Sequence, residues 1–302
     1  MKKYIYLFIA VLIFASCDKL EGPFMTDNII NPIDTSTNSF VKKILIEDFT
    51  GHTCPNCPDA ARELDAIHEI YGDQIIGMAV HVGKTFARPF PLGTGKFEYD
   101  FRTTWGETWD SFFGIGTAGL PKGMINRIDY PNDEHRKGKN EWGAAVQAEL
   151  NKDVDLGIVI SSNISGESGT ISINTKVLNN ISGSYNLVVC LTEDTIINWQ
   201  KDGQVEVENY EHKHVLRTVL NSEWGEQLTA STSLLSGDNF THTFNINLTS
   251  LEQFNIDYSK NTLFQGNGNA GGWNADNMNI VAYIYNTITK EILQVEETHL
   301  NN

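Results

Sequence analysis

The chain has 302 residues, 40% hydrophobic and 20% charged, and a formal net charge of −16 at pH 7. This length allows two domains, each with a hydrophobic core of its own. The acidic excess opposes the attraction to phosphate on which nucleic-acid binding depends, so we exclude a nucleic-acid partner. It also argues against attachment to anionic lipid through basic patches, but it does not argue against a covalent lipid anchor.

The N-terminus has the three parts of an export signal. Two lysines precede an apolar run over residues 4–14, and two small residues stand directly before Cys17. The run is too short to span a membrane, so we predict a signal peptide over residues 1–16. The Ala-Ser-Cys sequence resembles a bacterial lipobox, which implies that Cys17 is lipidated; the alternative is an ordinary signal peptide with a chance cysteine. Residues 17–40 are polar and aperiodic, which predicts a flexible tether.

The next segments alternate between strand and helix patterns. Residues 41–49 are rich in β-branched side chains and predict a strand. Apolar residues at three- and four-residue spacing over 60–71 predict a helix, and residues 75–82 form an apolar run typical of a strand buried on both faces. Strand, helix and strand predict a parallel βαβ crossover. An aromatic-rich insertion over 83–111, a strand over 122–128 and a helix around 142–150 would complete an α/β domain spanning residues 41–152.

The second half has a different periodicity, because apolar and polar residues alternate there with period two. Such alternation is typical of strands with one buried face. The predicted strands lie at residues 156–164, 171–177, 185–191, 205–220, 240–248, 280–286 and 291–297. About seven short strands in one domain predict an all-β, immunoglobulin-like sandwich over residues 153–302.

The sequence Cys54-Pro55-Asn56-Cys57 stands where the first strand meets the first helix. Unpaired N–H groups at a helix start stabilise a thiolate, which makes Cys54, the first and the more exposed cysteine of the pair, the candidate nucleophile. Cys57 lies one turn inward, near enough to resolve a mixed disulfide formed at Cys54. Two alternatives stay open, a permanent disulfide staple and half of a zinc site that only His52 and His81 could complete.

The residues around this motif resemble the thioredoxin-like family. The stretch from Asp48 to Cys54 matches, without a gap, the family's segment from its buried acidic residue to its first cysteine. The resemblance implies that Asp48 is the proton acceptor near the resolving thiol, with Glu47 as the neighbouring alternative. It also implies that Pro121 is a cis-proline beside the cysteines, and that the backbone of Leu120 binds an extended substrate chain.

Three residues beside the cysteines complete the predicted substrate-binding set, namely His52, Pro55 and Asn56. The chain also departs from the thioredoxin pattern, because Thr53 replaces the usual tryptophan and Pro55-Asn56 replaces Gly-Pro. The dipeptide between the cysteines bears on the direction of exchange, and the sequence does not place this pair on the scale of reduction potentials.

Nearly the whole mature chain is similar to the Omp28-related lipoproteins of Bacteroidetes. The similarity includes the lipobox, the EDFTGHTCPNCP motif, the YEHKHVLR segment at residues 210–217 and the KEILQVEE segment at residues 290–297. It implies an outer membrane lipoprotein, on the periplasmic face or at the cell surface.

Other residues give weaker indications of a functional site than the cysteine motif does. His212 and His214 stand two apart on a predicted strand, and His242 lies on another, but no acidic or cysteine partner accompanies them at metal-binding spacing. We predict neither a metal site nor a cofactor. Cys190, within an apolar run, is predicted to be a buried small hydrophobic residue.

Together these patterns predict a lipid-anchored envelope protein that exchanges thiols and disulfides with exported proteins. Its membrane contact would be through the lipid anchor alone. The alternative is a surface or periplasmic binding lipoprotein, in which the thioredoxin-like domain is a scaffold and the cysteine pair a structural disulfide.

Overall fold

A computed structural model describes residues 40–301, so the predicted signal peptide, Cys17 and the tether up to Ser39 lie outside the described residues. The first half contains β1 (Ile44–Thr50), α1 (Cys57–Tyr71), η1 (Gly72–Gln74), β2 (Ile75–His81), α2 (Thr104–Phe113), α3 (Ile115–Ala118), β3 (Lys122–Ile125), η2 (Asp133–His135) and α4 (Lys139–Leu150). The second half contains β4 (Leu156–Ser165), β5 (Ser168–Val177), β6 (Ile181–Ser182), β7 (Tyr185–Glu193), β8 (Ile196–Asp202), β9 (Val205–His212), β10 (Val215–Val219), β11 (Glu226–Gln227), β12 (Ser233–Leu234), β13 (Asn239–Asn247), α5 (Leu248–Asn261), η3 (Ala275–Asn277), β14 (Met278–Asn286) and β15 (Ile292–His299).

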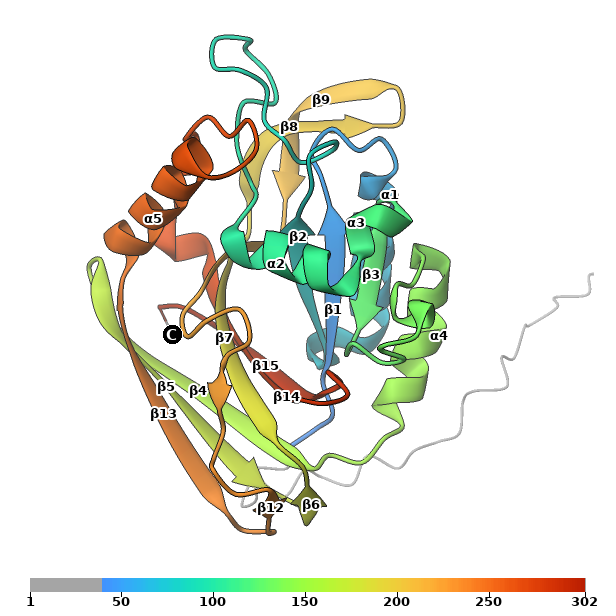
Figure 1. The fold of residues 1–302 in the computed structure, drawn as a ribbon, viewed down its shortest axis with the longest axis vertical. Helices are drawn as coiled ribbons and strands as arrows, with labels where there is room; N and C mark the ends of the chain where they lie inside the picture. Colours follow the sequence, from blue (N-terminus) through green and yellow to red (C-terminus); the bar gives the residue numbers. More distant parts are fainter. Residues whose placement is uncertain (1–39, 302) are drawn as a thin grey trace, which may run out of the picture. The chain divides into compact units, whose positions relative to one another are not determined.

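One eight-stranded sheet runs through both halves, in the order β15-β14-β7-β10-β2-β1-β3, with β11 beside β7 (Figure 1). β1 and β2 are parallel and α1 connects them, so the predicted crossover is confirmed. The halves join where Val215 of β10 pairs with Ala79 of β2. The predicted boundary after residue 152 does fall between α4 and β4, but residues from Phe40 onward form one compact unit. The two predicted segments are therefore not separate bodies.

A three-stranded sheet, β13-β5-β4, supplies a second β layer against the C-terminal half of the main sheet. Leu187, Val189 and Leu191 of β7 face this layer. Val188 and Cys190 face the opposite way, into a core shared with the helical side of the protein. β7 is therefore buried on both faces, whereas its alternation predicted one buried face. Cys190 is a free, buried cysteine, as predicted.

The second half also contains α5, which the sequence did not predict (Figure 1). Its buried side includes Asn255 and Ser259, so it lacks the apolar stripe by which helices are usually found. Asn255 donates a hydrogen bond to the Arg217 carbonyl at 2.6 Å, and Ser259 donates one to Asp100 at 2.7 Å. The Asn247 side chain caps the helix by accepting a hydrogen bond from the Ser250 N–H.

The predicted strand over residues 205–220 is two strands. β9 pairs with β8 in a separate hairpin, while β10 belongs to the main sheet. Between them His214 has a φ of +55°, which breaks the strand. Figure 1 shows the β8–β9 hairpin apart from the main sheet, near the start of α1. No helix within residues 40–301 is both long and apolar enough to cross a membrane.

A buried ion pair fixes the junction between the halves. Arg127, just after β3, donates two hydrogen bonds to Glu47 of β1 at 2.8 and 2.6 Å and one to the Tyr283 hydroxyl of β14 at 2.8 Å. Its guanidinium lies 5.0–5.7 Å from the ring centres of Trp109, Phe113, Tyr283 and Tyr285. Both charged side chains are 0% exposed. The pair therefore links β1, α2 and β14 inside the core.

Removing one partner of this pair is expected to destabilise the whole of residues 40–301. Glu47→Gln leaves the Arg127 charge buried without its counter-ion, so we expect a loss of about 3–5 kcal/mol in the free energy of unfolding. Urea titration should show one cooperative transition at a lower midpoint. Glu206→Gln, which removes an exposed partner of Lys96, serves as the control and should cost less than about 1 kcal/mol. Equal effects of the two substitutions would contradict this role of Glu47.

Candidate active site around the Cys54–Cys57 disulfide

The cysteines lie in the tight connection between β1 and α1. Cys54 and Cys57 form a disulfide with their Cα atoms 5.5 Å apart. α1 begins at Cys57, with a proline in its first turn, where a missing N–H costs nothing. Gly51 permits the preceding turn, because a Cβ there would come within 2.5 Å of the Phe86 backbone carbonyl. The motif therefore has the strand-to-helix placement that the sequence predicts.

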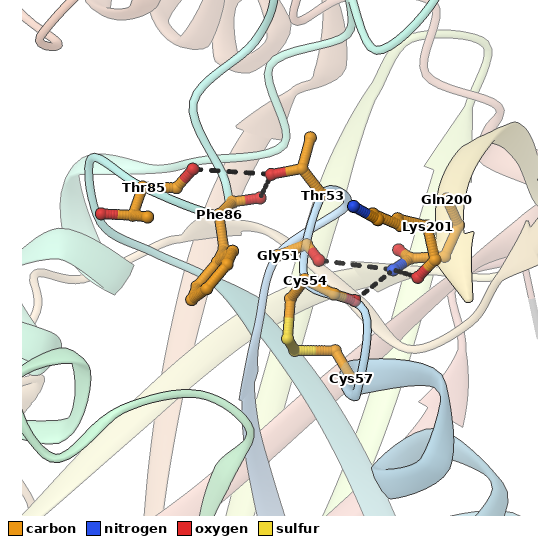
Figure 2. The surroundings of a disulfide bond; sticks show 8 residues. All are labelled: Gly51, Thr53, Cys54, Cys57, Thr85, Phe86, Gln200 and Lys201. Atoms are coloured by element: carbon orange, nitrogen blue, oxygen red, sulfur yellow. Dashed lines mark hydrogen bonds between the residues drawn. A yellow bond between two sulfur atoms is a disulfide. The ribbon is translucent and has the colours of Figure 1, made fainter. Parts of the chain in front are cut away.

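Neither cysteine is exposed. Cys54 is 1% exposed and Cys57 is 2% exposed, so the expectation that Cys54 is the more accessible residue is wrong for this structure. On one side the motif is bound by the segment after β2. The N–H and hydroxyl of Thr53 both donate to the Phe86 carbonyl at 2.9 Å, as Figure 2 shows for the hydroxyl.

The β8–β9 hairpin binds the motif from the other side. The Gln200 amide donates to the Gly51 and Cys54 carbonyls at 3.4 and 3.2 Å (Figure 2). The N–H groups of Lys201 and Gly203 donate to the carbonyls of His52 and Pro55, both at 2.8 Å. The hairpin thus occupies backbone acceptors on both sides of Cys54. Sequence reasoning missed these residues, because nothing local marks a contact between segments so far apart in the chain.

Asp48 lies in β1, two residues before the strand ends, and is 3% exposed. Its Oδ1 atom has no hydrogen-bond partner, and burial raises the pKa of the carboxyl group to about 7. Asp48 and Cys57 line the same cavity, which has a volume of about 300 Å³. Glu47, the neighbouring alternative, is instead paired with Arg127. Adjacent strand residues point to opposite faces, so only Asp48 is placed to serve the cysteines.

Buried histidines surround the motif. His52 is fully buried with Nε2 3.2 Å from the Arg88 carbonyl, and its predicted contact with a substrate stays a prediction. His81 stacks on Phe101 at 4.5 Å and lies 5.7 Å from the His212 ring. Burial lowers the pKa of His52 to about 4 and that of His212 to about 3, and it lowers the pKa of His81 as well. All three imidazoles are therefore neutral at pH 7.

His81 and His212 line the cavity beside Asp48, a role that sequence reasoning did not assign to them. For His81 a signal did exist, since it is the one polar residue in the apolar run IIGMAVHV. His212 ends β9 and His214 lies beyond it, so the two do not share a strand face as predicted. His242 lies elsewhere, within hydrogen-bonding distance of Glu226 and the Leu228 carbonyl. Within residues 40–301, no group of three or more His, Cys, Asp or Glu residues is placed to hold a metal ion.

Leu120 and Pro121, which the resemblance implies would bind an extended substrate, lie at the end of the main sheet that carries the cysteines. The Leu120–Pro121 peptide is cis, as the resemblance implied. β3 starts at the next residue, and Lys122 pairs with Phe49 of β1, so Pro121 lies next to the end of β1 that leads to the cysteines. Leu120 is half-buried against the core. Pro55 is half-buried and Asn56 is exposed. Substrate binding by these residues stays a prediction.

Comparison with known proteins assigns the chain to a family. The family model described as "Outer membrane protein Omp28" matches residues 110–302, which is more than half of the chain. The chain belongs to the Omp28 family. The cysteine motif lies before the residues that this Omp28 match covers, so the assignment does not bear on its chemistry. No curated protein matches the chain.

Two solved structures illustrate the range of similarity to this chain. HBP35 of Porphyromonas gingivalis has a similar fold with a TM-score of 0.63 and 14% identity, over 88% of this chain and 77% of that one. A domain of the outer membrane lipoprotein Omp28 from the same organism is 18% identical, covers 49% of this chain and 89% of that one, and has a TM-score of 0.29. The family description, an outer membrane protein, supports the predicted outer-membrane location.

The pH dependence of stability should report on Asp48. Between the unfolded pKa of about 4 and the folded pKa of about 7, the native protein holds a proton that the unfolded chain has lost, so stability falls as pH rises. Asp48→Asn removes this titration. We expect the variant's stability relative to wild type to increase by up to about 1.4 kcal/mol per pH unit over this window and to level off above it. Urea titrations of the oxidised proteins between pH 4 and 8 measure the difference, and a constant difference would contradict the assignment.

Proposed function

We propose that this protein is an envelope thiol–disulfide exchange protein, anchored through a lipid on Cys17, whose Cys54–Cys57 pair acts on other exported proteins. The observation that carries the proposal is the shared cavity of Cys57 and the buried carboxyl group of Asp48. Burying a carboxyl oxygen without a partner costs several kcal/mol, and a disulfide that only staples the chain needs no such group. A resolving thiol does need such a group nearby, because the carboxylate accepts the proton of the thiol.

The local topology supports the same proposal. A parallel β1-α1-β2 unit carries the cysteines at the start of its helix, and β3 lies antiparallel to β1 directly after a cis-proline. This arrangement resembles the thioredoxin-like pattern, and under the proposal Leu120 and Pro121 would hold an extended substrate. This unit is not an isolated domain, because strands β10, β7, β14 and β15 of the second half extend its sheet.

In the proposed cycle, the Cys54 thiolate attacks a substrate disulfide and forms a mixed disulfide, releasing one substrate thiolate. Cys57 gives its proton to Asp48, and the resulting thiolate attacks Cys54 Sγ. The Cys54–Cys57 bond forms while the bond from Cys54 to the substrate breaks. The second substrate sulfur leaves as a thiolate and takes up a proton. The neutral histidines His81 and His212 themselves contribute no positive charge next to the Asp48 carboxylate.

The burial of both cysteines favours a second candidate, a binding lipoprotein in which the disulfide is structural. Under this alternative the hairpin contacts at Gly51, His52, Cys54 and Pro55 are permanent. Binding to a partner would then survive the loss of the disulfide. The two candidates differ in whether Cys54 is needed for any reaction.

Exchange activity should distinguish the two candidates. With insulin as the disulfide substrate and reduced glutathione as the terminal reductant, Cys54→Ser should lower the rate of disulfide reduction to the uncatalysed background, because the nucleophile is gone. Asp48→Asn should slow the reaction tenfold or more, because a proton acceptor is worth at least that much. Cys190→Ala changes the described free cysteine far from the motif and should keep the wild-type rate. A wild-type rate equal to background would rule out the exchange function.

A further inference from the structure

The two sides of the disulfide are not equivalent. Cys57 lines the cavity and Cys54 does not. Around Cys54, the neighbouring carbonyls of His52 and Pro55 already accept hydrogen bonds from Lys201 and Gly203. Those two carbonyls are therefore not free to pair with another chain. In this arrangement the cavity reaches Cys57 and not Cys54.

The cavity lining combines polar and apolar side chains, and several of its buried polar groups have no partner. Those groups are Asp48 Oδ1, both ring nitrogens of His81 and Nε2 of His212. Each of these residues is at most 5% exposed. At its outer end the cavity is lined by Arg62, Asp65 and Lys213, whose side chains are 55%, 48% and 43% exposed. It thus reaches from solvent to Cys57.

The size of the cavity limits what can enter. Its volume of about 300 Å³ is at the lower end of the 300–1,000 Å³ typical of small-molecule sites. A folded protein or a strand does not fit such a space, whereas a small molecule with hydrogen-bond donors does. A thiol has both a donor for Asp48 and a sulfur atom that can reach the disulfide.

We propose that this cavity binds a low-molecular-weight thiol, which exchanges with the disulfide by attacking Sγ of Cys57. The inference rests on the proposed exchange function and names the class of its redox partner. It assigns exported proteins and small thiols to opposite ends of the same disulfide, with the β8–β9 hairpin separating them.

The chemistry balances over two steps. An incoming thiol gives its proton to the Asp48 carboxylate, and its sulfur forms a bond to Cys57 Sγ while the Cys54–Cys57 bond breaks. Cys54 leaves as a thiolate just before the N-terminus of α1, where the helix favours negative charge. A second small thiolate attacks the bound small-molecule sulfur, and Cys57 leaves and takes the proton back from Asp48. Two thiols become one small disulfide, and the protein gains a dithiol once Cys54 is protonated.

The reverse reaction of single-cysteine variants tests where the small molecule enters. The full chain carrying Cys54→Ser or Cys57→Ser is mixed with cystine, and adducts are assigned by peptide mass spectrometry over time. We expect the thiol of Cys57 in the first variant to react at least tenfold faster than the thiol of Cys54 in the second. Ala61→Phe, added to Cys54→Ser, fills the cavity from α1 and should slow the reaction tenfold or more. Ala66→Phe, an exposed position on the same helix, is the matched control and should have no effect.

Each outcome decides between the proposals. Faster reaction at Cys54, or reaction at Cys57 that Ala61→Phe leaves unchanged, would overturn the cavity as the entry site while leaving the exchange function intact. Failure of both thiols to react until urea is added would overturn the cavity proposal and the exchange function together. The comparison of the two serine variants stands even where Ala61→Phe fails to fold.

Discussion

The structure depends on two adjacent carboxyl groups of β1 that point to opposite faces of the main sheet. Glu47 faces the core shared by both halves, where its buried pair with Arg127 is surrounded by aromatic rings of α2 and β14. Asp48 faces α1, where it lies unpaired in the cavity beside Cys57. One strand therefore carries a charge that holds the fold together and a carboxyl group that the fold leaves without a partner. The Glu47–Arg127 pair is explained by stability, because a buried Arg127 without its counter-ion would destabilise the fold. The unpaired carboxyl group of Asp48 is not explained in this way, because its burial costs free energy.

The closed disulfide follows from how the halves are joined. Because β10 pairs with β2, the segment just before it brings His212, His214 and the β8–β9 hairpin against the cysteine motif. The second half thus completes the site, providing Gln200 and the N–H groups of Lys201 and Gly203. The same hairpin covers Cys54 and forms part of the cavity wall next to Cys57. Access to the two sulfur atoms is therefore controlled by one element.

The sequence predicts the local parts of this architecture well, because those parts have their own periodicity. The β1-α1-β2 crossover, α4, most strands of the second half and the cis-proline at Pro121 can all be inferred from spacing or from family resemblance. The sequence fails where a feature depends on distant partners. Nothing in residues 196–212 predicts a hairpin bound to the cysteines, and α5 is hidden because Asn255 and Ser259 take the place of apolar residues on its buried side. Exposure of Cys54 was mispredicted for the same reason, since the residues that cover it lie far away in the chain.

Under the proposed function the Cys54–Cys57 disulfide is a working redox pair, and its reduction potential tests this most directly. Equilibration of the full chain with glutathione buffers, followed by acid quenching and mass spectrometry, gives the fraction of Cys54 and Cys57 that is reduced. We predict a potential above about −230 mV, in the range of exchange proteins. A potential below about −300 mV, with thiols that react only after unfolding, would show a structural disulfide and contradict the account.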